Sequence, residues 1–141
     1  MKITRQADYA VRVVLYHAGR PENSIVTVDE VSRIKKIPRS FAAKIYQRLC
    51  RAGITSSLRG ATGGFVLARR PDDISLLEVV EAIDGEVDIN LCVVDEKACS
   101  LSNSCAVHPV WMELRRDMVR KMKAVDFGSL AKVEKEVKEK R

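Results

Sequence analysis

Three of the four cysteines in this 141-residue chain lie close together, and one of its two histidines follows them. Cys92, Cys99 and Cys105 are separated by six and five residues, and His108 comes three positions later. Thiolates are soft ligands for iron–sulfur clusters or zinc. Zinc usually takes closely spaced cysteine pairs, which are absent here, whereas wider gaps allow a loop to wrap around a larger cluster. The spacing therefore favours an iron–sulfur cluster and leaves zinc as an alternative.

The residues between these cysteines give the segment little to fold around. Most are short, polar or charged, and they include Asp95, Glu96, Ser100, Ser102, Asn103 and Ser104. Since burial of apolar side chains is the main force that orders a segment, this one needs another source of order, which a bound metal would supply. The remaining alternative is three free or oxidised thiols in a disordered loop.

The N-terminal region does not look like a secretory signal. It disperses Lys2, Arg5 and Arg12 through an amphipathic pattern and has no continuous apolar stretch with a small-residue cleavage site. No apolar run approaches the ~18 to 20 residues that cross a bilayer. We therefore expect a cytoplasmic protein, in which clustered cysteines bind metal or sense redox state more often than they form disulfides.

Charge is distributed unevenly along the chain, whose net charge is +6. Residues 1–70 carry 14 Lys and Arg against 4 Asp and Glu, whereas residues 71–110 carry 1 against 9. A basic N-terminal half is the electrostatic pattern expected of a phosphate-binding surface. A solvated basic face without a partner would give the same pattern, so the charge needs structural support.

The basic half predicts a helix-turn-helix. After a first helix that follows Thr4, the spacing of Thr27 and Glu30 suits a capping box at the start of a short second helix. A third helix is expected over 38–52, because proline suits a first helical turn and the glycine at position 53 suits a stop. Its inner face is expected to be Phe41, Ile45, Leu49 and Ala52. Two short helices joined by a tight turn, the second basic outside, are typical of this DNA-binding motif.

A β-hairpin is expected directly after this helix. Residues that favour strands at 54–58 and 65–68 flank a glycine-rich loop over 59–64. The loop lacks the helix and Lys–Ser/Thr pair of a nucleotide-binding loop, so a wing is the better interpretation.

The helix and the wing are expected to contact different parts of a DNA duplex. An arginine at a hairpin tip suits a narrow minor groove, where the negative potential is concentrated. The expected contacts are to bases from Arg39, Ser40 and Lys44, to phosphates from Arg48 and Arg51, and to the flanking minor groove from Arg59.

Two further helices are expected in the C-terminal half. Ser75 and Glu78 have capping-box spacing for a short helix that stops at Gly85. A longer helix starts at Pro109 and carries the apolar stripe Val110, Trp111, Leu114, Met118, Met122 and Val125. This stripe can fold back on its own domain or pair with a second subunit, since helix-turn-helix proteins usually bind DNA as dimers.

The expected fold class is mainly α with a small β-hairpin. We expect a winged helix-turn-helix DNA-binding domain over 1–85, a cysteine-containing cluster-binding loop over 86–108 and a dimerisation helix over 109–126. A C-terminal tail over 127–141 is expected to complete the chain, with its last residues, 134–141, frayed and solvated.

These residues together resemble the Rrf2 family of winged-helix transcription regulators. The resemblance rests on "DYAVRVVLYHA", on "RLCRAGITSSLRGATGGFVLARRPDDISLLEVVEAIDG" and on the cysteine spacing. It implies a cytoplasmic homodimer that binds a double-stranded DNA operator and carries one iron–sulfur cluster, 4Fe–4S or 2Fe–2S, in each subunit. It further implies that the cluster sets operator affinity in response to redox state, nitric oxide or cluster supply. Where some relatives show an acidic residue on the recognition helix, this chain has Ala43, which predicts a different operator.

Two residues are candidates for the fourth ligand of the cluster. His108 resembles the histidine that completes the cluster in some members of the family, and Asp8 resembles an aspartate that the partner subunit supplies in others. Asp8 is favoured for a four-iron cluster. Each residue also has a structural interpretation, since Asp8 can pair with Arg12 and His108 can cap a helix.

The sequence leaves one alternative function open and disfavours another. A winged-helix regulator without a cluster could bind zinc, respond through its thiols or be controlled by a protein partner. An enzyme is not expected, because the cysteines and histidine lack a recognisable third catalytic residue or oxyanion site.

Overall fold

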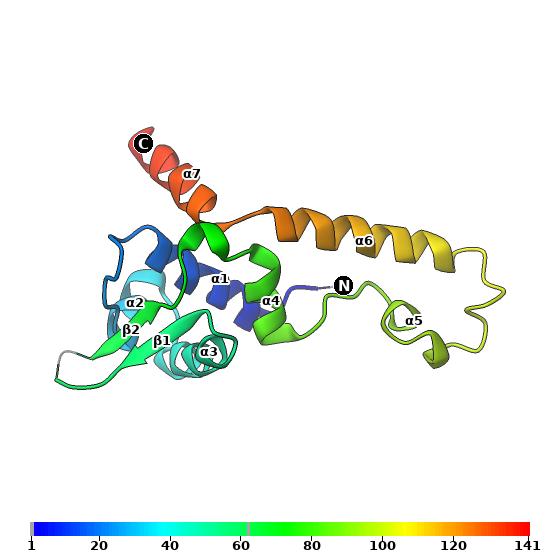
Figure 1. Cartoon of the computed structure of the whole chain (residues 1–141), viewed down its shortest axis with the longest axis horizontal. Helices are drawn as coiled ribbons and strands as arrows, with labels where there is room; N and C mark the ends of the chain where they lie inside the picture. The colour runs from blue at the N-terminus through cyan, green and yellow to red at the C-terminus, as the bar shows by residue number, and fades with distance from the viewer. Residues whose placement is uncertain (1, 62) are drawn as a thin grey trace.

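The computed structural model describes residues 2–61 and 63–141 and is mainly helical, with one antiparallel hairpin (Figure 1). The helices are α1 (Arg5–Ala18), α2 (Val28–Lys35), α3 (Arg39–Arg51), α4 (Leu76–Asp84), α5 (Leu91–Val94), α6 (His108–Ala124) and α7 (Phe127–Glu139). The strands are β1 (Thr55–Leu58) and β2 (Gly64–Leu67), and two short 3-10 turns are η1 (Pro71–Asp73) and η2 (Glu96–Ala98). The predicted fold class is confirmed.

Helix starts follow the local signals in the sequence. The Thr4 hydroxyl accepts a hydrogen bond from the Ala7 amide at 3.1 Å and caps α1. Ser75 and Glu78 form both bonds of a capping box at the start of α4. Caps of this kind satisfy amide groups that have no partner inside the helix.

Helix α3 is rotated relative to the face that its sequence predicts. Phe41 is 38% exposed and Ala52 is exposed, whereas Tyr46 is fully buried. Tyr46 tolerates burial because its hydroxyl lies 2.9 Å from Nε2 of His17, which satisfies its hydrogen-bonding capacity. Phe41 instead packs edge-on against Tyr9 at the border of the core.

The hairpin forms the predicted wing beside α3. Thr55 pairs with Leu67 and Leu58 with Gly64. Val26 adds an isolated bridge to Phe65, with backbone bonds of 2.9 and 2.8 Å, and so fixes β2 to the loop before α2. Figure 1 shows α3 and the hairpin at the same edge of the molecule.

Residues 127–139 form helix α7, where the sequence predicted only a C-terminal tail whose last residues, 134–141, are frayed. Phe127 at its start is fully buried in the main core. Asp126 accepts hydrogen bonds from the amide and hydroxyl of Ser129, both at 2.8 Å, and these bonds lower the pKa of Asp126. The helix was missed because its apolar contacts, made by Phe127 and Leu130, depend on core residues that are distant in the sequence.

Helix α6 packs on the core along only half of its length. Met118, Val119 and Met122 contact a small cluster that contains Leu77 and Val80 of α4. The first half extends away from the core together with α5 and η2 (Figure 1). We refer to residues 88–114 as the cysteine arm and to the described residues outside it as the main domain.

Candidate cluster site and nucleic-acid interface

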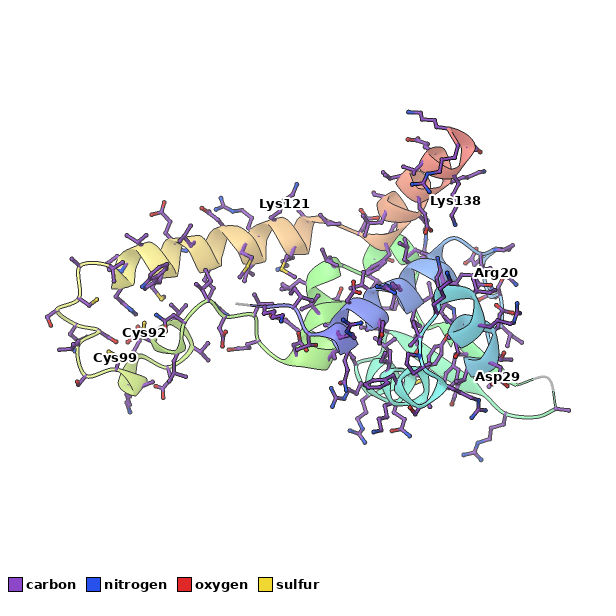
Figure 2. The ribbon with its side chains drawn as sticks, turned by 180° about the vertical axis from the view of Figure 1, so that it is seen from behind. Arg20, Asp29, Cys92, Cys99, Lys121 and Lys138 are labelled. Carbon is purple, nitrogen blue, oxygen red and sulfur yellow. The ribbon has the colours of Figure 1, made fainter. Side chains whose placement is uncertain are left out.

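The cysteine arm holds three of the four thiols of the chain. Cys92 lies in α5, Cys99 directly follows η2, and Cys105 precedes α6. All three are half-buried and none forms a disulfide. Figure 2 shows Cys92 and Cys99 at the same far end of the molecule.

His108 is the first residue of α6, at the point where the chain leaves the arm's loops. Its amide donates to the Cys105 carbonyl at 3.3 Å, which keeps the two residues close. Its Nδ1 atom is buried and has no hydrogen-bond partner in the described part of the chain, and the same holds for Oγ of Ser102. A buried polar atom without a partner costs free energy, so a ligand bond to this nitrogen would remove a penalty.

The three thiols and the His108 imidazole are suitable ligands for an iron–sulfur cluster, but in the single chain they do not surround a common point as metal ligands do. Within residues 2–61 and 63–141 no three His, Cys, Asp or Glu side chains converge as metal ligands. Asp8 lies on α1 in the main domain and pairs with Arg12 at 2.7 Å, as its structural interpretation predicts. The structure therefore places His108 beside the cysteine loops and Asp8 away from the arm.

The predicted DNA-contacting residues are exposed along α3 and at the wing tip. Lys44, Arg51 and Arg59 make no ion pair among the described residues, whereas Arg39 pairs with Asp29 of α2 at 2.5 Å. Both partners of that pair are more than two-thirds exposed, so the pair contributes little stability and can open on contact with DNA. Ser40 is exposed in the first turn of α3.

Arg48 makes contacts within the protein that its sequence position did not suggest. Its guanidinium donates to the Ile83 carbonyl at 3.0 Å and to Oε1 of Gln6 at 3.4 Å. A cation at the C-terminal end of α4 is favoured by the helix dipole. Arg48 therefore links the predicted recognition helix to the end of α4, just before the cysteine arm.

Sequence reasoning missed a buried polar pair behind the recognition helix. His17 of α1 is 5% exposed and bonds Tyr46 of α3, whose ring stacks on Phe65 of β2 with centroids 3.9 Å apart. Burial lowers the pKa of His17 to about 4 and raises the pKa of Tyr46. The pair is neutral at pH 7, and no local pattern identifies two residues that are 29 positions apart.

These features define a winged helix-turn-helix protein with an attached cysteine arm. The profile of the Rrf2 family, described as "Iron-dependent Transcriptional regulator", matches residues 3–133. The chain belongs to the Rrf2 family. It is a transcription regulator and not an enzyme, as the sequence predicts.

Relatives of similar sequence are named as transcription regulators. A putative HTH-type transcriptional regulator of Aquifex aeolicus is 30% identical over 124 residues, which cover 86% of each chain. The HTH-type transcriptional regulator IscR of Aliivibrio salmonicida is 30% identical over 92% of this chain and 77% of the relative.

Solved structures show the same fold. CymR, the global cysteine regulator of B. subtilis, aligns with a TM-score of 0.78 at 18% identity, over 94% of this chain and 98% of CymR. IscR of T. potens aligns with a TM-score of 0.75 at 20% identity, over 97% and 90% of the two chains. No helix in the described part of the chain is long and apolar enough to cross a membrane.

Proposed function

We propose that the protein is a homodimeric, cytoplasmic DNA-binding regulator whose operator affinity is set by an iron–sulfur cluster in the cysteine arm. The observation that carries this proposal is the composition of the arm. It presents three half-buried free thiols and a buried, unpartnered imidazole nitrogen in a segment with one buried apolar residue among those described, Val93. The proposed division into a DNA-binding domain, a cluster loop and a dimerisation helix follows from it.

The proposed ligands are Cys92, Cys99 and Cys105, with His108 or Asp8 of the partner subunit as the fourth. The buried Nδ1 of His108 favours the local ligand, whereas the distance of Asp8 from the arm in sequence and fold is what a ligand supplied by the partner requires. A bound cluster would supply redox and small-molecule reactivity at the iron without a cysteine ligand. The protein's contribution is to hold the thiolates and to transmit the order of the arm to α4 and α3.

Exposed apolar side chains on the arm support the dimer. Among the described residues, those on the arm are Leu91, Val94, Leu101, Val107, Val110 and Leu114, with exposures between 43% and 66%. The last three lie at the start of α6 and along it, on the half that does not pack on α4. Exposed apolar patches of this kind mark interaction surfaces. Burial against the same patch of a second copy would give a two-fold symmetric interface.

The DNA-binding half of the proposal uses α3 and the wing. Base edges would be contacted by Arg39, Ser40 and Lys44. Phosphates would be contacted by Arg48 and Arg51, and the flanking minor groove by Arg59. For Arg48 this requires exchange of its bond to the Ile83 carbonyl for a phosphate. Release of that bond would couple DNA contact to the end of α4.

The test is the absorption spectrum and the iron and sulfide content of anaerobically purified protein. Wild type should absorb near ~400 nm, and Cys92→Ser, Cys99→Ser or Cys105→Ser should bleach it, because each removes one ligand. Cys50→Ser is the matched control, since Cys50 lies on α3 and bonds Thr55 at 3.2 Å. Full iron and sulfide in all three arm variants would refute the assignment of these cysteines as ligands. Wild type without iron and sulfide would refute the cluster, and zinc without colour would support the alternative regulator.

The fourth ligand is tested by the rate of cluster loss in air. His108→Ala should accelerate loss if the arm closes its own site, and Asp8→Ala should do so if the partner subunit closes it. Arg12→Ala is the control for Asp8, because it breaks the same surface ion pair and leaves the carboxylate. Unaltered decay in both ligand variants would exclude both residues.

A further inference from the structure

A groove with a volume of about 970 Å³ lies on the main domain, away from the cysteine arm. Its walls are the loop after α1, the segment from the end of β2 through η1, and α7. Apolar side chains, among them Ala18, Leu67 and Ala131, line part of it. The volume lies in the range of pockets that hold small organic ligands.

Cationic groups outnumber acidic groups around this groove. Six Lys and Arg side chains line it, against four carboxylates. Glu134 lies 3.5 Å from Lys35 and 3.7 Å from Lys138, so it is already neutralised. Figure 2 shows two of the lining cations, Arg20 and Lys138, at the end of the molecule away from the cysteines, with Lys138 on α7.

Three of the lining cations make no ion pair among the residues that the structure describes. These are Arg20, Lys132 and Lys135. Glu22 and Glu139 also line the groove, but the lining as a whole keeps an excess of positive charge. An apolar surface edged by free cations is complementary to a ligand with an apolar body and an anionic group.

The wall of the groove contacts the DNA-reading elements directly. His17 lines the groove and bonds the Tyr46 hydroxyl of α3 at 2.9 Å. Tyr46 stacks on Phe65 of β2, at an interplanar angle of 6°. Leu67, two residues further along β2, lines the groove itself. A ligand here therefore lies one side chain away from both the recognition helix and the wing.

We propose that this groove binds a small amphipathic organic anion, such as a carboxylate or phosphate ester, and that its occupancy alters operator affinity through His17, Tyr46 and Phe65. The protein then has a second input that is independent of the cysteine arm. The binding part stands without the proposed cluster, and the coupling part rests on the proposed binding of DNA.

Binding is tested with anilinonaphthalene sulfonate, a fluorescent aromatic anion, on the full chain. The charge-reversed pair Lys132→Glu and Lys135→Glu should raise its dissociation constant on the order of tenfold, because two free cations at the groove are replaced. The control pair Lys121→Glu and Lys140→Glu makes the same change of net charge outside the groove and should leave the constant unchanged. Phenylnaphthylamine, which has the aromatic framework without the sulfonate, should bind more weakly to wild type and equally to all variants.

Two results would overturn the site. Equal losses in both variant pairs would show a response to net charge alone. Tight binding of the neutral analogue would show an apolar surface without preference for an anion.

Coupling is tested on a duplex that the protein selects from a random-sequence pool. The anionic probe should change operator affinity of wild type by about fivefold, the lower end of ordinary allosteric coupling. Tyr46→Phe retains the ring stacked on Phe65 and removes the hydroxyl that meets His17. It should bind the probe as wild type does and lose the fivefold effect. The coupling would be refuted if the probe changed operator affinity equally in both proteins, or did not change it in wild type. Failure to select any duplex would refute DNA binding and would not affect the measurement of probe binding at the groove.

Discussion

The main domain and the cysteine arm differ in how many apolar side chains they bury. Seventeen buried residues form the core of the main domain, and they come from α1 to α4, from loops between them and from Phe127. In the arm, Val93 at 7% exposure is the single buried apolar side chain among the described residues. The domain therefore has a core of its own, whereas the arm has little apolar burial to order it.

Under the proposed function, this contrast separates the segment that would hold the cluster from the domain that would bind DNA. A segment with little burial of its own can gain or lose order at small cost to the rest of the protein. The two ends of the arm are anchored just outside it, where Arg115 donates to the Val87 carbonyl at 2.8 Å and where Met118, Val119 and Met122 of α6 pack on α4.

Removal of the Phe127 side chain should have the largest effect on stability. Phe127→Ala leaves a cavity in the main core and should lower the free energy of unfolding by about 3–5 kcal/mol. Val133→Ala on the same helix is the control, because Val133 is 55% exposed and its truncation should cost less than about 0.5 kcal/mol. Urea denaturation followed by circular dichroism measures both. Equal midpoints would mean that α7 is not part of the core.

Acid should destabilise the main domain through His17. Its pKa is about 4 when folded, compared with 6.5 for the free side chain, so between these values the unfolded chain takes up a proton that the folded chain does not. The free energy of unfolding should therefore fall by roughly 3 kcal/mol as pH drops from 6.5 to 4. His17→Gln should remove this component, whereas His108→Gln in the arm should retain it. Identical pH profiles for wild type and His17→Gln would refute the assignment.

The same substitution in the two regions should have unequal effects. Val79→Ala, at a fully buried site of α4, should lower the free energy of unfolding by about 1–3 kcal/mol. Val93→Ala in the arm should lower it by less than about 0.5 kcal/mol in metal-free protein, because the arm adds little to the cooperative core. Denaturation of the two variants side by side measures the difference. Similar losses would show that the arm folds together with the main domain.

The wing should contribute to DNA binding without affecting the arm. Arg59→Ala should cost about 1 kcal/mol of operator binding, more on A·T-rich flanks, where the minor groove is narrow. Arg116→Ala, an exposed arginine of α6, is the control. Affinity measured on two operators that differ only in their flanks decides this, together with an unchanged cluster spectrum. Equal losses on both flanks would remove Arg59 from the minor groove.

Local signals in the sequence predicted much of the fold. The caps at Thr4 and Ser75 and the glycine-rich wing depend on residues a few positions apart, and each formed as expected. The orientation of α3 and the existence of α7 depend on contacts between distant residues, such as Tyr46 with His17 and Phe127 with the core. Periodicity along one helix does not carry that information.

The candidate sites, too, depend on contacts between distant residues that local sequence patterns do not reveal. The spacing of the cysteines identified a donor set, and the chain places these residues in one arm without closing a shell around a metal. Asp8 illustrates the reason, because in the proposed role it would reach the cluster of a second subunit, and one chain does not place such a residue. The groove beside α7 was not visible in the sequence, since its three walls come from separate segments.

The placement of tryptophan gives the arm its own optical signal. Trp111 is the single tryptophan of the chain and lies half-buried on α6 within the arm, whereas all three tyrosines belong to the main domain. Tryptophan emission excited at the red edge of its absorption therefore originates from the arm alone, while far-ultraviolet ellipticity is dominated by the helices of the domain. The two signals follow the two regions separately in one sample, without any added label.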